Sequence, residues 1–142
     1  MDNNRLSKNL IAIFAGTFLG VALFWVGAFF SLIILAQRVN RDEESNDVMK
    51  SGNTYFVALC IISFIASFLG GLITTKLAAD KTNKPALITG LLLTLMILAI
   101  NNFWVSMETS ILYACMLFPA LLGAYIILKK INNNSSFNSN QL

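Results

Sequence analysis

The sequence predicts an all-α fold, a polytopic membrane protein built as a bundle of four transmembrane helices. Composition, hydropathy and the spacing of charged residues all lead to this prediction. Of the 142 residues, 56% are hydrophobic and 12% are charged, where an ordinary soluble domain has about 25% charged residues. The mean hydropathy is +0.70. So few charged side chains cannot cover a water-facing surface. We therefore expect the outer surface of this protein to have the lipid bilayer as its partner.

The charged residues divide the chain into four long uncharged stretches, which contain 29, 25, 23 and 20 residues. A helix rises about 1.5 Å per residue and needs about 20 residues to cross a hydrocarbon core of about 30 Å. Each stretch is therefore long enough for one span. We expect one transmembrane domain over residues 1–131, with spans at about 9–36, 54–75, 85–103 and 109–128.

The first span has a competing interpretation as a cleaved signal peptide, because Arg5 and Lys8 precede it. Signal peptides carry only about 7 to 15 apolar residues before a small-residue cleavage site. The stretch here is about twice as long and lacks that ending, so we predict an uncleaved anchor. A helix over 9–36 is longer than a bilayer requires and should tilt or project beyond the membrane.

The connections between the spans are predicted to be short, except for the first. Residues 38–53 are rich in acids and end in Gly52-Asn53, so we expect a solvated connection closed by a turn. Pro85 suits the first turn of the third helix. Glu108 suits the first turn of the fourth as a capping acid, with ion or substrate binding as the alternative. The Asn- and Ser-rich tail, 132–142, is expected to be disordered and cytoplasmic.

The orientation follows from the basic residues, which are retained on the cytoplasmic side. Seven of them lie on one side of the predicted membrane, and these are Arg5, Lys8, Lys76, Lys81, Lys84, Lys129 and Lys130. Three lie on the other side, and these are Arg38, Arg41 and Lys50. We therefore predict a multi-pass protein of the bacterial inner membrane with both termini in the cytoplasm.

Small residues recur at intervals of four in the first two spans, and such rows allow close approach of helix backbones in lipid. The rows are Ala12, Gly16 and Gly20 in the first span, and Ser63, Ser67 and Gly71 in the second, with Ala66 and Gly70 parallel to the latter. They predict tight packing of spans one and two. The alternative is a seam between two copies of the chain.

Pro119 near the middle of the fourth span should kink that helix, because it leaves the carbonyl of Cys115 without its usual donor. The small residues that follow it, Ala120, Gly123 and Ala124, should let a neighbouring helix or a hydroxyl approach the freed backbone. Three hydroxyl residues fall at similar depth, Ser63, Ser67 and Thr94. They either satisfy a structural kink or line a small polar spot of the kind that transporters use to bind substrate.

No catalytic, cofactor-binding or metal-ligating residue set is predicted. The chain has no histidine, and its two cysteines, Cys60 and Cys115, fall inside spans without a metal-ligand spacing. We expect them to pack as small apolar residues, with a disulfide or metal role as the alternative. The basic residues flank the spans and form no nucleic-acid-binding stripe. We therefore expect neither an enzyme nor a nucleic-acid-binding protein.

Three segments carry a resemblance: 68–78, with Gly-Gly before a basic turn; 84–90, with Pro-Ala-Leu at a helix start; and 118–125, with a proline and a glycine. Over about residues 54–128 the chain resembles a broad group of small uncharacterised four-helix bacterial inner-membrane proteins. The resemblance implies the four-helix architecture and no particular activity.

Two functional hypotheses remain. The first is a non-enzymatic accessory or assembly component of a larger inner-membrane system, with a membrane-protein partner. The second is a small oligomeric transporter or channel, because four helices enclose little volume unless several copies assemble. Small multidrug exporters have this size and helix count, but they depend on a glutamate embedded in the first span, which this chain lacks.

Overall fold

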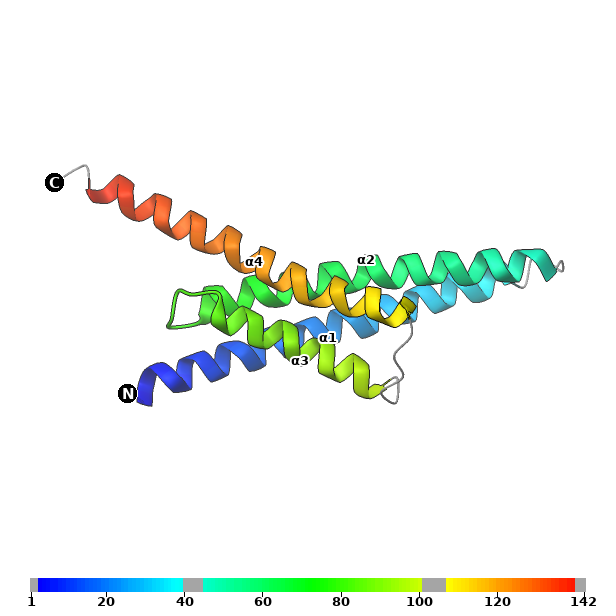
Figure 1. Ribbon diagram of the computed structural model, residues 1–142, viewed down its shortest axis with the longest axis horizontal. Helices are drawn as coiled ribbons and strands as arrows, with labels where there is room; N and C mark the ends of the chain where they lie inside the picture. The colour runs from blue at the N-terminus through cyan, green and yellow to red at the C-terminus, as the bar shows by residue number, and fades with distance from the viewer. Residues whose placement is uncertain (1–2, 40–44, 101–106, 140–142) are drawn as a thin grey trace.

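The computed structural model describes residues 3–39, 45–100 and 107–139. Those residues form four α-helices and no strand: α1 (Asn3–Val39), α2 (Ser45–Leu77), α3 (Lys84–Ile100) and α4 (Met107–Ser139). The helices run along the long axis of the molecule, side by side (Figure 1). Helices suit apolar sequences in lipid because they satisfy every backbone polar group internally. The predicted all-α four-helix class is confirmed.

Three helices contain segments long and apolar enough to cross a membrane. The segments are Asn3–Ile34, Thr54–Leu77 and Ala114–Asn132, while the apolar part of α3, Lys84–Ala99, is shorter. The outward surface of the bundle is correspondingly apolar, and on α1 the side chains of Phe14 and Phe18 are 70% and 78% exposed. Large aromatic side chains exposed to this degree suit a lipid environment and mark this chain as a membrane protein.

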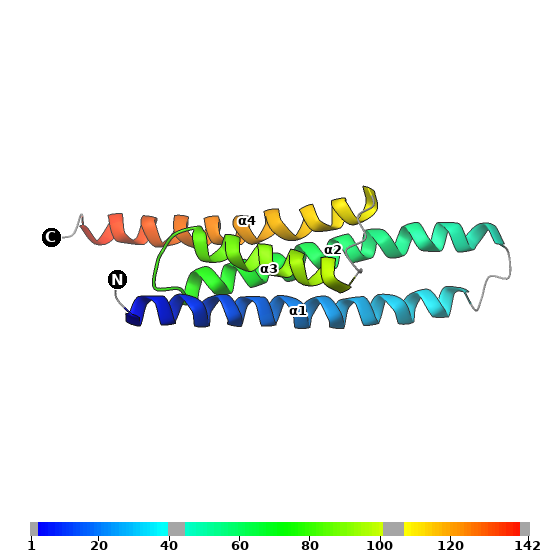
Figure 2. The ribbon, with the colours of Figure 1, turned by 60° about the horizontal axis from the view of Figure 1, so that its bottom comes forward.

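The first connection is much shorter than predicted. α1 continues to Val39 and α2 already begins at Ser45, so Gly52-Asn53 lies inside α2 and not at a turn. A glycine within a helix costs only about 1 kcal/mol, and no proline follows to stop the helix. The α1–α2 hairpin consequently extends beyond the other two helices (Figure 2). With 37 residues, α1 is about 55 Å long, which exceeds the thickness of a bilayer core of about 30 Å.

The last helix also runs further than predicted. We expected disorder from residue 132, but α4 continues through the Asn- and Ser-rich segment to Ser139. After Gly123 the chain has no glycine or proline to end the helix, and extending a formed helix adds one hydrogen bond per residue. Glu108 lies in the first turn of α4 as predicted, and its side chain falls outside the described part. α3 ends at Ile100, before the predicted limit at residue 103, and residues 101–106 lie outside the described ranges.

α2 is the central helix of the bundle. Both α2 and α3 contact each of the other helices, but the contacts of α2 with α1 and α4 are the most extensive, and the described parts of α1 and α4 do not contact each other. Figure 2 shows α1 and α4 on opposite sides of α2 and α3. α2 therefore needs two closely packing faces, one for α1 and one for α4.

The face of α2 toward α1 is formed by the row of Ala66 and Gly70. A Cβ atom placed on Gly16 of α1 would lie 2.6 Å from the Gly70 carbonyl oxygen, and one placed on Gly20 would lie 3.4 Å from the Ala66 carbonyl oxygen. Ala12, which begins the row on α1, is fully buried. The predicted close contact of the α1 row is confirmed, and it lies within a single chain.

The face of α2 toward α4 is formed by the parallel row of Ser67 and Gly71. A Cβ atom on Gly71 would lie 2.6 Å from the Cα atom of Ala120, and one on Gly123 of α4 would lie 2.5 Å from the Phe68 carbonyl oxygen. We predicted that both rows of α2 would pack on the first span, and for this row the prediction was wrong. The two rows are about 100° apart around the helix, so they meet different neighbours.

Candidate functional site

The polar spot, one of the two alternatives for the hydroxyls in the middle of the bundle, is not assembled. The Ser63 hydroxyl donates a hydrogen bond to the Leu59 carbonyl of its own helix at 2.7 Å, and the Thr94 hydroxyl donates to the Gly90 carbonyl at 2.8 Å. The Ser67 hydroxyl donates across to α4. Each hydroxyl is bonded to a different carbonyl, so the three do not converge on a common ligand.

Pro119 is fully buried within α4, and a hydroxyl does approach the backbone near it. The hydroxyl is that of Ser67, and its acceptor is the Met116 carbonyl, one residue beyond the Cys115 carbonyl that the proline deprives of its donor. Together with the contact between Gly71 and Ala120, this hydrogen bond joins α2 to α4 at the level of the proline. These contacts support the structural interpretation of Pro119.

A pair of threonines that the sequence analysis did not single out connects α2 to α3. The Thr74 and Thr89 hydroxyl oxygens are 2.9 Å apart, and both side chains are fully buried. Each also lies within hydrogen-bonding distance of a carbonyl four residues earlier, those of Gly70 at 2.9 Å and Pro85 at 3.1 Å. Because each hydroxyl has one proton, only two of these three contacts are hydrogen-bonded at a time.

The two cysteines are brought together, although they are far apart in the sequence. Cys60 on α2 and Cys115 on α4 are free, partly buried, and line the same pocket of about 260 Å³ with Ile61 and Phe64. In the described ranges no cluster of three or more His, Cys, Asp or Glu side chains is present that would hold a metal ion. The pair is therefore an apolar dithiol at the surface of the bundle.

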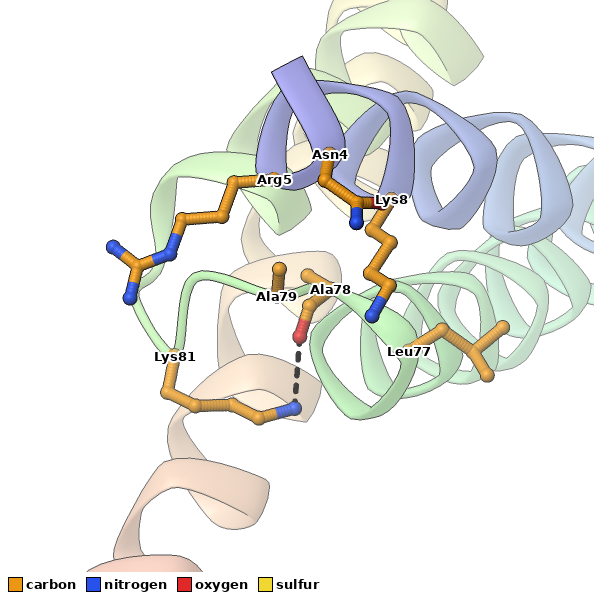
Figure 3. A pocket seen from close by; sticks show the side chains of 7 residues that line it. All are labelled: Asn4, Arg5, Lys8, Leu77, Ala78, Ala79 and Lys81. Carbon is orange, nitrogen blue, oxygen red and sulfur yellow. Dashed lines mark hydrogen bonds between the residues drawn. The ribbon is translucent and has the colours of Figure 1, made fainter. Parts of the chain in front are cut away.

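A concentration of positive charge lines a cavity at the end of the bundle that holds the described start of α1. A pocket of about 470 Å³ lies between the first turns of α1 and the link that follows α2 (Figure 3). Its lining residues are Asn4, Arg5, Lys8, Leu77, Ala78, Ala79 and Lys81. Three of the seven are basic and none is acidic. Sequence analysis treated these basic residues only as determinants of orientation.

The Asn9 side chain anchors the α2–α3 link to α1 beside this pocket. Its Oδ1 atom accepts hydrogen bonds from the backbone N–H groups of Ala79 at 2.9 Å and Asp80 at 3.1 Å. Its Nδ2 atom donates to the Asp80 carboxylate at 2.6 Å. One asparagine thus fixes the backbone of the link and holds the neighbouring carboxylate. Sequence analysis could not find this contact, because the partners are 70 and 71 residues apart.

The Lys81 side chain folds back onto the end of α2. Its Nζ atom donates hydrogen bonds to the carbonyl oxygens of Lys76 at 3.0 Å and Ala78 at 2.8 Å. The last carbonyls of a helix carry partial negative charge and lack intrahelical donors. Lys81 satisfies them and places a positive charge at the wall of the pocket.

Arg5 and Lys8 are different, because neither is engaged with another described residue. Both side chains are exposed, and no hydrogen bond or ion pair links them to residues 3–39, 45–100 or 107–139. They lie three residues apart on α1, which puts them on neighbouring positions of one helix face. The pocket therefore has two available cations on α1 and one committed cation on the link.

No protein-family model, curated protein or solved structure matches the chain.

Proposed function

We propose that this protein is a non-enzymatic accessory or assembly component of a larger system in the bacterial inner membrane. The observation that carries the proposal is the close backbone packing of α2 against α1 and α4. At Gly16 against Gly70 and at Gly71 against Ala120, backbones approach so closely that a single methyl group would not fit. Helices packed in this way form a rigid unit whose outer surface is what remains for interactions.

The buried polar groups support the same proposal. In the described part of the chain they are all hydroxyl side chains, namely Thr17, Ser63, Ser67, Thr74, Thr75 and Thr89. All but Thr17 bond to a carbonyl or to each other, and Thr17 Oγ1 is buried without a partner. Ion-coupled transporters and pumps usually bury ionisable groups along the conduction path. Hydroxyls bonded to helix carbonyls instead hold helices together.

Photo-crosslinking in living cells tests this proposal. A photoreactive phenylalanine analogue would replace Phe18 or Phe118, which are 78% and 64% exposed. They belong to α1 and α4, the two helices on opposite sides of α2 and α3 (Figure 2). An assembly component should give one reproducible adduct with another membrane protein, from one face and not from the other. Adducts only at multiples of the chain's own mass would reject the proposal and favour the oligomeric transporter or channel.

We also propose that the end of the bundle with the chain termini faces the cytoplasm. The described start of α1, the α2–α3 link and the described end of α4 all lie toward one end (Figure 1). The seven basic residues of the predicted cytoplasmic side lie in these segments or next to them, which supports retention of this end on the cytoplasmic side. With both native cysteines replaced by alanine, Ser45→Cys should react with a membrane-impermeant thiol reagent in intact cells. Thr82→Cys in the α2–α3 link should react only after permeabilisation; the reverse pattern would overturn the orientation.

A further inference from the structure

The pocket between α1 and the α2–α3 link has the chemistry of a phosphate-binding site at a membrane surface. Arg5 and Lys8 extend from α1 to opposite sides of Ala79, and Lys81 lies below Ala79 with its Nζ atom directed to the Ala78 carbonyl (Figure 3). A guanidinium group binds a phosphate through two parallel hydrogen bonds, and an ammonium group binds it as a point charge. Both groups here have no partner among described residues.

The negative groups close to the pocket make contacts of their own. Asp80 lies between two lining residues but does not line the pocket itself, and its carboxylate, which keeps its negative charge, accepts a hydrogen bond from Asn9. The carbonyl end of the α2 helix would repel an anion, but Lys81 caps it with two hydrogen bonds. Arg5 and Lys8 therefore form no ion pair with a described carboxylate, and Lys81 offsets the partial charge of the helix end.

The depth of the pocket relative to the membrane identifies the source of the phosphate. Leu77, which lines the pocket and is 53% exposed, is the last residue of the apolar segment Thr54–Leu77. On α1, Ile11 follows Lys8 by one turn and is 63% exposed. Basic side chains at the outer edge of apolar helix faces match a phospholipid, whose phosphate sits at the interface while its acyl chains run along the helices.

We propose that this pocket binds the headgroup phosphate of an anionic phospholipid. Arg5 and Lys8 bind the phosphate oxygens, Lys81 adds a fixed positive field, and the acyl chains descend past Leu77. The site holds one lipid at the junction of α1 with the α2–α3 link. This inference requires the bundle to lie in a membrane, and it does not depend on the proposed assembly role.

Native mass spectrometry of the full chain in detergent tests the proposal. Phosphatidylglycerol and phosphatidylcholine with identical acyl chains would be titrated separately, and their apparent Kd values compared. The wild type should bind phosphatidylglycerol roughly tenfold more tightly, because both lipids offer the phosphate but the positively charged choline of phosphatidylcholine is repelled by the three basic side chains of the pocket. Arg5→Gln/Lys8→Gln should lose this preference, and equal affinity for both lipids in the wild type would overturn the proposal.

The matched control is Lys84→Gln/Lys129→Gln, which removes the same charge from the same end of the bundle outside this pocket. It should keep the preference for phosphatidylglycerol. If both double variants lose the preference for phosphatidylglycerol equally, the lipid is attracted by the total positive charge of this end of the bundle. That result would overturn the proposed binding site. If inorganic phosphate at the same concentration displaces phosphatidylglycerol, the pocket recognises free phosphate and the lipid assignment is wrong.

A single variant guards against loss of folding in the double variant. Arg5→Lys keeps the charge but removes the planar fork of the guanidinium group. It should weaken phosphatidylglycerol binding by about threefold, which lies between the wild type and Arg5→Gln/Lys8→Gln. Its helical circular dichroism and melting temperature without added lipid should match those of the wild type. Wild-type lipid preference in Arg5→Lys would remove Arg5 from the site and contradict the proposed bidentate contact.

Discussion

The hydroxyl of Ser67 in the middle of α2 donates a hydrogen bond to the backbone carbonyl of Met116 in α4, three residues before the buried Pro119. The bond joins two helices, and its donor and acceptor residues are 49 positions apart in the sequence. It lies within a contact where backbones, and not large side chains, form the interface. The proline and the serine therefore belong to one structural element, the α2–α4 contact.

Replacing Ser67 with alanine should destabilise the bundle by about 0.5 to 2 kcal/mol, because interhelical hydrogen bonds in membranes contribute about this much. Ser63→Ala is the matched control, since Ser63 is equally buried but bonds only to the Leu59 carbonyl of its own helix. The free energy of unfolding would be measured by SDS titration in mixed micelles. Equal losses in the two variants would contradict a special role for the α2–α4 hydrogen bond.

Gly16→Ala should cost about 1 to 3 kcal/mol, as overpacking does in protein cores. The added methyl group would meet the Gly70 carbonyl oxygen and the Thr74 hydroxyl, and a backbone oxygen cannot move aside. Gly20→Ala should be close to neutral, because its methyl group would meet the flexible ends of Leu93 at 2.9 and 3.0 Å. The gain in helix propensity of about 1 kcal/mol offsets that contact.

Thermal retention of the folded monomer in mild detergent would rank the two glycine variants. The contact lies within one chain, so Gly16→Ala should lower the melting temperature without changing the oligomeric size. If Gly16→Ala dissociates a dimer into intact monomers, the α1 row forms a seam between copies. Equal melting temperatures for Gly16→Ala and Gly20→Ala would show that the two glycines are equally tolerant of a methyl group.

Asn9→Ala should loosen the α2–α3 link without unfolding the bundle. The N–H groups of Ala79 and Asp80 lose their acceptor, so their hydrogen exchange should accelerate by roughly tenfold, as expected for about 1 kcal/mol or more per bond. Asn4→Ala, an exposed position on the same helix, should leave both amides unchanged. Exchange would be followed by mass spectrometry of peptides covering the link; unaltered exchange in Asn9→Ala would refute the anchoring role.

Mild oxidation with copper phenanthroline should join Cys60 and Cys115 within one chain, because both line the same pocket. The two thiols lose two protons to water and two electrons to the copper, which is reduced. A sulfur–sulfur bond forms between them. Alkylation after unfolding should then detect no free thiol. Moving the second thiol by one residue, in Cys115→Ala/Ala114→Cys, should slow the reaction strongly, because Ala114 faces outward and is exposed. Equal rates would mean that α2 and α4 are not packed in this register.

The sequence alone was sufficient to predict the four helices and the membrane class. An uncharged run of 20 or more residues has few alternatives to a helix in lipid, since its backbone must be hydrogen-bonded internally. The rows of Gly16 and Gly71 could also be recognised as contact positions, because a glycine offers lipid no side chain and allows backbones to approach. Those properties belong to single segments and can be read without their neighbours.

The helix ends were harder to predict, since polarity does not end a helix. Gly52 and the Asn- and Ser-rich segment up to Ser139 are polar or flexible residue types, yet both lie in helices. Adding residues to a helix that has already formed requires no new nucleation. The helix therefore continues until a proline, a cap or a steric conflict stops it. Hydropathy marks the part of a helix that fits the bilayer and not its full length.

Only the tertiary structure decided which residues meet. The rows of Gly70 and Gly71 on α2 are equally small and about 100° apart, so either could have faced α1. The positions of α3 and α4 assign Gly70 to α1 and Gly71 to α4. The same arrangement brings Asn9 to the α2–α3 link and turns Arg5 and Lys8 toward a common pocket. These contacts join residues some 70 positions apart, and no local pattern of hydrophobicity or charge encodes them.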